Sequence, residues 1–97
     1  MLIYGYERIK DALQKHADSR KAIDMWYANA SAAHWKNLSE VRAFWPTADA
    51  VGTCTVFNVK GNKYRLITTI DYGEQIISIN ELLTHAEYNK DKWKRHC

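Results

Sequence analysis

The residues around Gly61-Asn62 constrain the fold more than any other part of the chain, because they predict a tight β-hairpin. Runs rich in β-branched and aromatic residues, 55–60 and 63–70, flank this dipeptide. A glycine-containing loop of two residues between such runs is typical of a hairpin turn. We therefore expect Lys60 to lie opposite Lys63. Counting outward predicts three further pairs: Val59–Tyr64, Asn58–Arg65 and Phe57–Leu66.

Alternation along these two strands predicts one apolar and one basic face, because cross-strand partners share a face. The apolar face would carry Phe57, Val59, Tyr64 and Leu66. The opposite face would carry Asn58, Lys60, Lys63 and Arg65. Like charges directly opposite each other destabilise a hairpin by up to about 1 kcal/mol per pair. Their presence suggests an anion that offsets the repulsion; the alternative is a solvated strand face that happens to be basic.

Length and composition indicate a single domain, 1–97, because 97 residues suffice for only one modest core. The net charge of +3 permits a polyanionic partner without requiring one. With only Cys54 and Cys97, we expect neither a disulfide framework nor a metal site. No secretory signal pattern is present, and no apolar run approaches the roughly 20 residues that span a bilayer. We therefore expect a cytoplasmic protein without a membrane contact or a cofactor.

The first third of the chain predicts a short strand and two helices. Leu2–Tyr4 is an apolar run before a glycine, which suits a first strand. From about residue 6 to residue 16 the apolar positions follow helical spacing. Asp18 or Ser19 can cap a second helix, and the apolar stripe of this helix, which continues to Ala33, predicts core packing.

A short helix and a third strand complete the predicted framework. Ser39 is the expected N-cap of a short helix, and Pro46 ends it, because the residue before a proline avoids helical geometry. Residues 47–52 are expected to form a loop. After the hairpin, 71–74 predicts another turn and 75–83 a third strand, so the strands should form an antiparallel meander.

The order of these elements indicates an α+β fold. Thr84 is a candidate cap for a last helical segment, from His85 to about Trp93. Helices followed by strands in so short a chain predict two to three helices on one face of a twisted antiparallel sheet. A short N-terminal strand and a short C-terminal helical segment would complete it. The uncovered face of the sheet would then carry the basic residues of the hairpin.

His85 and Tyr88 are the candidates for acid–base chemistry near that face. They are three residues apart and would share one face of the last helix, which could overhang the sheet. The alternative is that Tyr88 packs as a cover and His85 is a polar residue near the helix cap. His16 lies on an apolar helix face, where we expect it to be satisfied locally. No Gly-rich phosphate loop, HExxH motif or CxxC motif is present.

Metal-free cleavage of RNA fits these residue types. It requires a base for the 2′-hydroxyl, cations for the charge that builds on phosphorus, and a proton source for the leaving 5′ oxygen. Arg65 can grip two phosphate oxygens. Repulsion between Lys60 and Lys63 should lower a lysine pKa, so that one of them could act as the base. His85 could be acid or base, and Tyr88 could orient, stack on a nucleobase or donate a proton.

Two runs of residues carry a resemblance to a known family. They are the run from Phe57 to Arg65 and the run from Thr84 to Tyr88, supported by Trp26-Tyr27 and Trp35-Lys36. With them the chain resembles the HigB toxins of bacterial type II toxin–antitoxin modules, within the wider RelE-like superfamily. The likeness extends roughly from residue 2 to residue 90.

This resemblance implies a RelE-like endoribonuclease, or mRNA interferase, that cuts translated mRNA, commonly on the ribosome. It also implies a HigA-type helix-turn-helix antitoxin that holds the toxin inactive in a hetero-oligomer. The implied catalytic residues are Lys60, Lys63, Arg65, His85 and Tyr88. The expected RNA-binding residues are Asn58, Lys90, Lys92, Lys94 and Arg95.

Two other functions fit the same scaffold. Relatives in the wider superfamily poison DNA gyrase by binding it, although Arg65, His85 and Tyr88 argue against that function here. A non-catalytic RNA-binding module would use the same basic face without cleaving RNA. Discrete new mRNA ends after expression would distinguish the nuclease from both alternatives.

Overall fold

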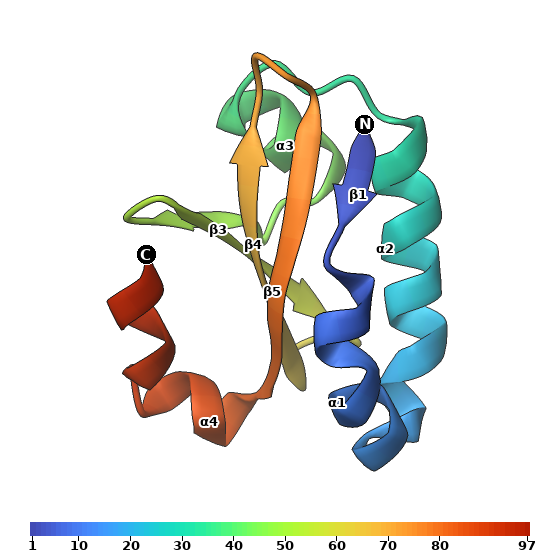
Figure 1. Cartoon of the computed structure of the whole chain (residues 1–97), viewed down its shortest axis with the longest axis vertical. Coiled ribbons are helices and arrows are strands. Elements are labelled where there is room, and N and C mark those ends of the chain that lie inside the picture. Colours follow the sequence, from blue (N-terminus) through green and yellow to red (C-terminus); the bar gives the residue numbers. More distant parts are fainter.

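The computed structural model describes residues 1–97 and contains a twisted sheet of five strands in the order β1-β5-β4-β3-β2 (Figure 1). The strands are β1 (Leu2–Tyr4), β2 (Asp49–Val51), β3 (Cys54–Val59), β4 (Tyr64–Asp71) and β5 (Ile76–Thr84). The α-helices are α1 (Lys10–Lys15), α2 (Arg20–Ala32), α3 (Leu38–Phe44) and α4 (His85–Asn89). Three 3-10 turns complete the chain: η1 (Tyr6–Ile9), η2 (Ala17–Ser19) and η3 (Lys92–His96). The predicted α+β architecture is confirmed.

The predicted hairpin register is confirmed, whereas the predicted all-antiparallel sheet is wrong at one edge. The pairs Phe57–Leu66, Asn58–Arg65 and Val59–Tyr64 form as expected, and β4 pairs antiparallel with β5. Strand β1 instead pairs parallel with β5; the helices carry the chain from β1 to β2 at the far edge, and the strands then return to β5. The segment expected to be a loop contributes β2, which pairs with β3 at the other edge.

The helix caps follow the sequence only in part. Thr84 caps α4 as predicted, and Glu87 completes a capping box with it. Asn37, not Ser39, caps α3, because its side chain accepts a hydrogen bond from Glu40 N at 3.0 Å. Ser19 precedes α2 without a side-chain cap, since its hydroxyl donates to His16 O at 2.7 Å.

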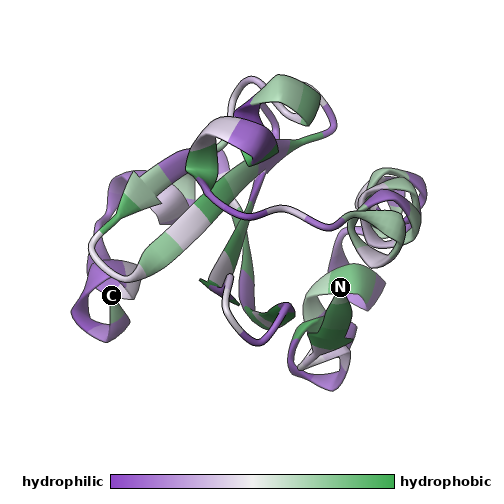
Figure 2. Cartoon of the chain, turned by 90° about the horizontal axis from the view of Figure 1, so that it is seen from above, coloured by the Kyte–Doolittle hydropathy of each residue, from purple (hydrophilic) through white to green (hydrophobic).

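The main core lies between the sheet and the layer formed by α1, α2 and α3. Its centre is aromatic: Trp26 of α2 packs edge-on against Phe57 of β3 at 5.4 Å between ring centroids. The predicted apolar stripe of α2 is confirmed by its buried residues Ile23, Trp26 and Ala30, and Figure 2, which looks down this helix, shows both hydrophobic and hydrophilic parts of its ribbon. Gly5 allows η1 to approach β5, because its φ is +89° and an added Cβ would lie 2.3 Å from Ile79 O.

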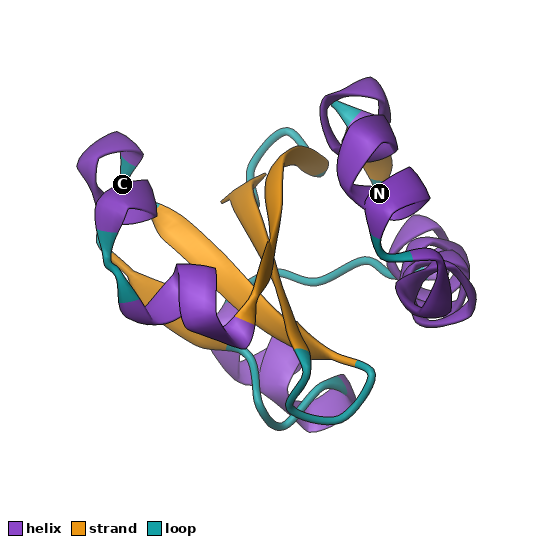
Figure 3. Ribbon diagram, turned by 90° about the horizontal axis from the view of Figure 1, so that it is seen from below, coloured by secondary structure: helices purple, strands orange, loops and turns teal.

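The second face of the sheet is covered, although the sequence predicts an open face there. The segment from α4 to Cys97 folds back along the sheet, on the side away from α1 and α2 (Figure 3). Trp93 is 3% exposed and packs with Cys54, Val56 and Ile67. No helix of the structure is both long enough and apolar enough to cross a bilayer.

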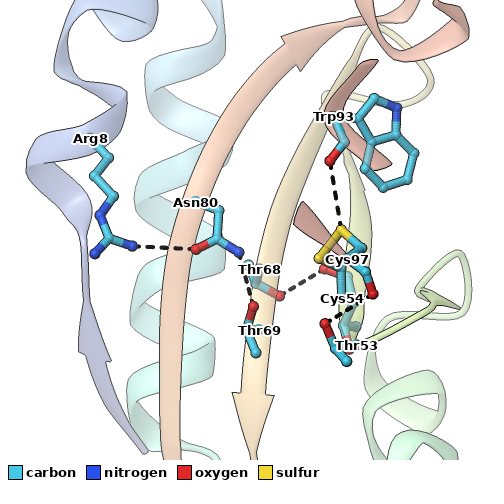
Figure 4. The surroundings of a disulfide bond; sticks show 9 residues. Arg8, Thr53, Cys54, Thr68, Thr69, Asn80, Trp93 and Cys97 are labelled. Atoms are coloured by element: carbon cyan, nitrogen blue, oxygen red, sulfur yellow. Dashed lines mark hydrogen bonds between the residues drawn. A yellow bond between two sulfur atoms is a disulfide. The ribbon is translucent and has the colours of Figure 1, made fainter. Parts of the chain in front are cut away.

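A disulfide joins Cys54 to Cys97, although two cysteines alone predicted no disulfide framework. Their Cα atoms are 5.2 Å apart, and both Thr53 N and Thr53 Oγ1 donate to the Cys97 carbonyl oxygen. Figure 4 shows Trp93 beside this bond, at the start of β3. The disulfide and these hydrogen bonds hold the end of the chain against the sheet.

Candidate functional site

The loop Lys60–Lys63 joins β3 to β4 and forms one end of the sheet. It differs from the predicted turn at Gly61-Asn62, because the left-handed residues are Lys60 (φ 54°) and Gly61 (φ 64°). Lys63 N donates to Lys60 O at 3.2 Å and closes the loop. A left-handed conformation is uncommon for a lysine, and such residues often occur at functional sites. Strand alternation therefore stops before either lysine, and it no longer determines the direction of their side chains.

Lys60 and Lys63, which we call the lysine pair, both reach across to Asp18 in η2. Lys60 Nζ lies 3.3 Å from Asp18 Oδ2 and donates to the Asp18 carbonyl oxygen at 3.1 Å. Lys63 Nζ contacts the same Oδ2 atom. Tyr64 Oη donates to Asp18 Oδ1 at 2.5 Å. One carboxylate thus pairs with two ammonium groups and accepts a hydrogen bond from one phenol.

These contacts shift the pKa values of the residues around Asp18. The hydrogen bond from Lys63, with those from Tyr64 and Lys60, holds the pKa of the Asp18 carboxyl well below its usual range. The same hydrogen bond to Asp18 raises the pKa of Lys63. Hydrogen bonding to Asp18, together with burial, raises the pKa of Tyr64. The predicted lowering by lysine–lysine repulsion is therefore wrong for Lys63, because the intervening carboxylate outweighs it, and Lys63 remains an ammonium.

Arg65 lies on the other side of β4, together with the C-terminal segment. Its Nη1 donates to Asn62 O at 3.0 Å and to Tyr64 O at 3.2 Å, and its Nη2 donates to Asn62 Oδ1 at 2.6 Å. Its Cζ lies 5.1 Å from the centre of the Tyr88 ring. Arg65 is only 7% exposed, so in this conformation it fixes the loop and has little surface for a phosphate.

Tyr88 is held in place from within the C-terminal segment. Trp93 stacks on its ring at 4.9 Å between centroids, and Trp93 Nε1 donates to Tyr88 O at 2.9 Å. The Arg65 contact uses the same ring. Tyr88 thus packs between a buried tryptophan and a buried arginine, in agreement with the covering role that the sequence left open.

His85 begins α4 directly beside the loop, because its backbone N donates to Lys63 O at 3.1 Å. Its side chain is exposed, and its Nδ1 atom lies 3.0 Å from Asn89 Nδ2. This contact orients the ring and leaves Nε2 for another partner. A second imidazole, that of His16, packs 5.3 Å from the Tyr64 ring on the helix side.

The remaining predicted RNA-binding residues lie around Arg65 and along the C-terminal segment. Asn58 Nδ2 donates to Asn62 Oδ1 at 3.4 Å. Lys94 forms an ion pair with Asp91 at 3.1 Å. An open groove of about 410 Å³ lies between β5 and the C-terminal segment, and both acidic and basic side chains line it. Its charged residues are Glu81, Glu87, Lys90, Lys92 and Arg95.

The structure divides the predicted catalytic set instead of placing it in one cradle. The lysine pair faces η2, Arg65 and Tyr88 lie on the opposite side of the sheet, and His85 flanks the loop between them. Asp18 was expected only as a possible helix cap. No pattern within one element could have revealed its role, since its partners are more than 40 positions away. No group of three His, Cys, Asp or Glu side chains could hold a metal ion.

Comparison with known proteins gives a family match across this part of the chain. Residues 19–91 match the family model for HigB_toxin, the RelE-like toxic component of a toxin–antitoxin system. Similar curated proteins include the mRNA interferase toxin HigB of Escherichia coli (strain K12) and the mRNA interferase HigB of Shigella flexneri. Each is 26% identical over 92 residues, which cover 92% of this chain and 88% of the relative.

Proposed function

The chain belongs to the HigB family of RelE-like toxins, and on this basis we propose that it is an endoribonuclease that cleaves mRNA as the toxin of a toxin–antitoxin pair. The observation that carries the proposal is the convergence of the lysine pair and Tyr64 on one carboxylate. These donors suit an anion, and the lysine side chains are 44% and 59% exposed. A phosphate of RNA is the anion that such a toxin must bind.

The proposed reaction is attack of a 2′-hydroxyl oxygen on the adjacent phosphorus. The bond from phosphorus to the 5′ oxygen breaks, so that the products are a 2′,3′-cyclic phosphate and a 5′-hydroxyl end. The lysine pair stabilises the negative charge that builds on the phosphorus oxygens. A well-placed donor of this kind contributes about 100- to 1,000-fold to the rate.

Proton transfer is assigned to His85 and Lys63. Asn89 contacts His85 Nδ1 and orients the ring. When the Asn89 amide turns its Oδ1 atom to accept from Nδ1–H, the Nε2 atom carries no hydrogen and can take the proton of the 2′-hydroxyl. In the free protein the contact with Asp18 keeps Lys63 an ammonium, so Lys63 brings to the complex a proton that it can give to the leaving 5′ oxygen. Exchange with solvent then restores both groups.

Arg65 and Tyr88 support this site as positioning residues. Arg65 fixes Asn62 in the middle of the loop, and Tyr88 covers the Arg65 guanidinium. Loss of either contact would move the loop that carries both lysines. Their substitution should therefore affect the rate through the position of the lysine pair.

The proposed binding partners extend beyond the reacting phosphate. Lys90, Lys92 and Arg95 line the open groove and can contact flanking RNA or ribosomal RNA, with an affinity that falls as salt rises. We infer cleavage of translated mRNA on the ribosome, in the cytoplasm, and inhibition by a HigA-type helix-turn-helix antitoxin in a hetero-oligomer. Cleavage should need no added metal and should survive a chelator wherever ribosomal magnesium is not limiting.

The test is induced expression in bacteria followed by mapping of mRNA 5′ ends. The wild type should create discrete new ends within coding regions, and co-expression of the antitoxin should remove them. The Lys60→Ala/Lys63→Ala and His85→Gln variants should create few or none. Lys21→Ala, which removes an exposed lysine on α2, is the matched control and should act as the wild type.

Two outcomes would replace the proposal with another function. Halted replication with intact transcripts would favour a gyrase-binding toxin. Binding of RNA by the purified protein without any new ends would favour a non-catalytic RNA-binding module. Unchanged cleavage by the lysine double variant would support the endoribonuclease activity but contradict its assignment to the lysine pair.

A further inference from the structure

Asp18 is the one residue that contacts every donor of the lysine-pair site. Its Oδ2 atom faces both ammonium groups and its Oδ1 atom accepts from Tyr64 Oη at 2.5 Å. Its main-chain oxygen also accepts from Lys60 at 3.1 Å. Both oxygens of the carboxylate are therefore engaged, and the free protein fills its own anion site.

A phosphodiester could use the same donors. Like a carboxylate, it presents two oxygens that share one negative charge, and such oxygens accept strong hydrogen bonds from ammonium groups. The two ammonium groups are accessible, because both lysine side chains are more exposed than that of Asp18, which is 35% exposed. Tyr64 is only 2% exposed, so an anion reaches its hydroxyl at the position that the Asp18 carboxylate leaves. Two ammonium groups and one carboxylate leave a net charge of only about +1 for an incoming phosphate.

We propose that the Asp18 carboxylate occupies a phosphate-binding site in the free protein, and that a phosphodiester of bound RNA replaces it as the acceptor of Lys60, Lys63 and Tyr64. This inference rests on the proposed function, because it takes RNA as the ligand. The displaced carboxylate turns to solvent while the donors keep an anion. Asp18 also prevents direct repulsion between the two lysines while no RNA is bound.

The proposal has a consequence opposite to that of a simple structural ion pair. If Asp18 competes with phosphate, removal of its charge strengthens RNA binding. If Asp18 only holds the lysines in position, its removal weakens RNA binding. The sign of the change in affinity therefore separates the two roles.

The decisive variant is Asp18→Asn, which keeps an oxygen that can accept from Tyr64 but removes the negative charge. The probe is a 2′-O-methyl oligoribonucleotide without terminal phosphates, which binds but has no free 2′-hydroxyl for cleavage. The variant should bind it about five- to tenfold more tightly at low salt, as expected from removal of one like charge about 5 Å away. The plot of log affinity against log salt should steepen by about 0.7, the value for one more neutralised phosphate on a single strand.

Asp24→Asn is the matched control, because Asp24 is exposed on α2 and its substitution changes the net charge equally. Affinity in Asp18→Asn equal to that in Asp24→Asn, or below that of the wild type, would overturn the proposal. A second measurement uses the wild-type protein, so it does not depend on whether the variant folds. Carbodiimide labelling of the Asp18 carboxyl should increase when the oligonucleotide binds, whereas unchanged or reduced labelling would contradict displacement.

The lysine variants separate this inference from the proposed function. If Lys60→Ala and Lys63→Ala bind the oligonucleotide as tightly as the wild type, RNA does not use this site and the proposed site is lost too. If they bind weakly while Asp18→Asn gains no affinity, the RNA site stands and only the role of Asp18 is wrong.

Discussion

Removal of the Cys54–Cys97 disulfide should lower the free energy of unfolding by about 4 kcal/mol. The two cysteines are 43 positions apart, and closing a loop of that length in the unfolded chain has an entropic cost of about 4 kcal/mol at 25 °C. For a domain of this size, such a change lowers the melting temperature by about 15–30 °C. The loss should begin at the C-terminal segment, because Trp93 is buried next to the bond.

The assay is thermal unfolding followed by circular dichroism, with and without a reductant. Cys97→Ser without reductant should melt at the temperature of the reduced wild type, and reductant should not change it further. Cys54 then remains as a buried thiol, which packs as a small hydrophobic group. Two free thiols in the unreduced wild type, or equal melting temperatures with and without reductant, would refute the reasoning.

Three further predictions follow from contacts at the same end of the molecule. Arg65→Ala should lower stability by about 2–4 kcal/mol in urea unfolding, because it removes hydrogen bonds from a buried charge to Asn62 and the loop; a stability within error of the wild type would contradict this clamp. Thr84→Ala should lose the cap of α4 and lower stability by about 1 kcal/mol, whereas Thr84→Ser, which keeps the hydroxyl, should lose less. The free energy of unfolding should fall as the pH drops below about 4.5, because folding lowers the pKa values of both Asp18 and Glu87 and the folded protein therefore binds protons less readily than the unfolded chain. Asp18→Asn should lose part of this pH dependence in acid unfolding. An unchanged pH profile in this variant would argue against the pKa shift at Asp18.

The sequence predicts the hairpin register correctly because the pattern that sets it is local. Alternation and the glycine in the loop are sufficient to pair Asn58 with Arg65. The pairing of β1 is not local, since a strand of three residues carries too little pattern to identify a partner beyond the helices. Strand β2 was missed for a similar reason, because Asp49–Val51 is short and mostly exposed.

The candidate site is predicted in composition but not in arrangement. Lys60, Lys63 and Arg65 are neighbours in the sequence, yet the left-handed loop removes the lysines from strand alternation. The long lysine side chains then form ion pairs with Asp18, while Arg65 is held by hydrogen bonds to Asn62. Such choices depend on tertiary contacts that no local pattern contains.

The C-terminal segment shows the same limit. The sequence predicts a helical segment with RNA-binding basic residues, but not that Trp93 and Cys97 anchor this segment to the sheet. An apolar aromatic within a basic stretch was the only signal that this segment packs. Two cysteines so far apart in the sequence gave no indication of their pairing.

The central claim is that the lysine pair at the end of the β3–β4 hairpin binds the phosphate that is cleaved. Its most direct test is the rate at which the purified protein cuts a defined mRNA on purified ribosomes. The account predicts that Lys60→Ala/Lys63→Ala, folded by circular dichroism, cleaves at least about 100-fold more slowly than the wild type, while Lys21→Ala cleaves at the wild-type rate. A folded double variant that cleaves as fast as the wild type would contradict it.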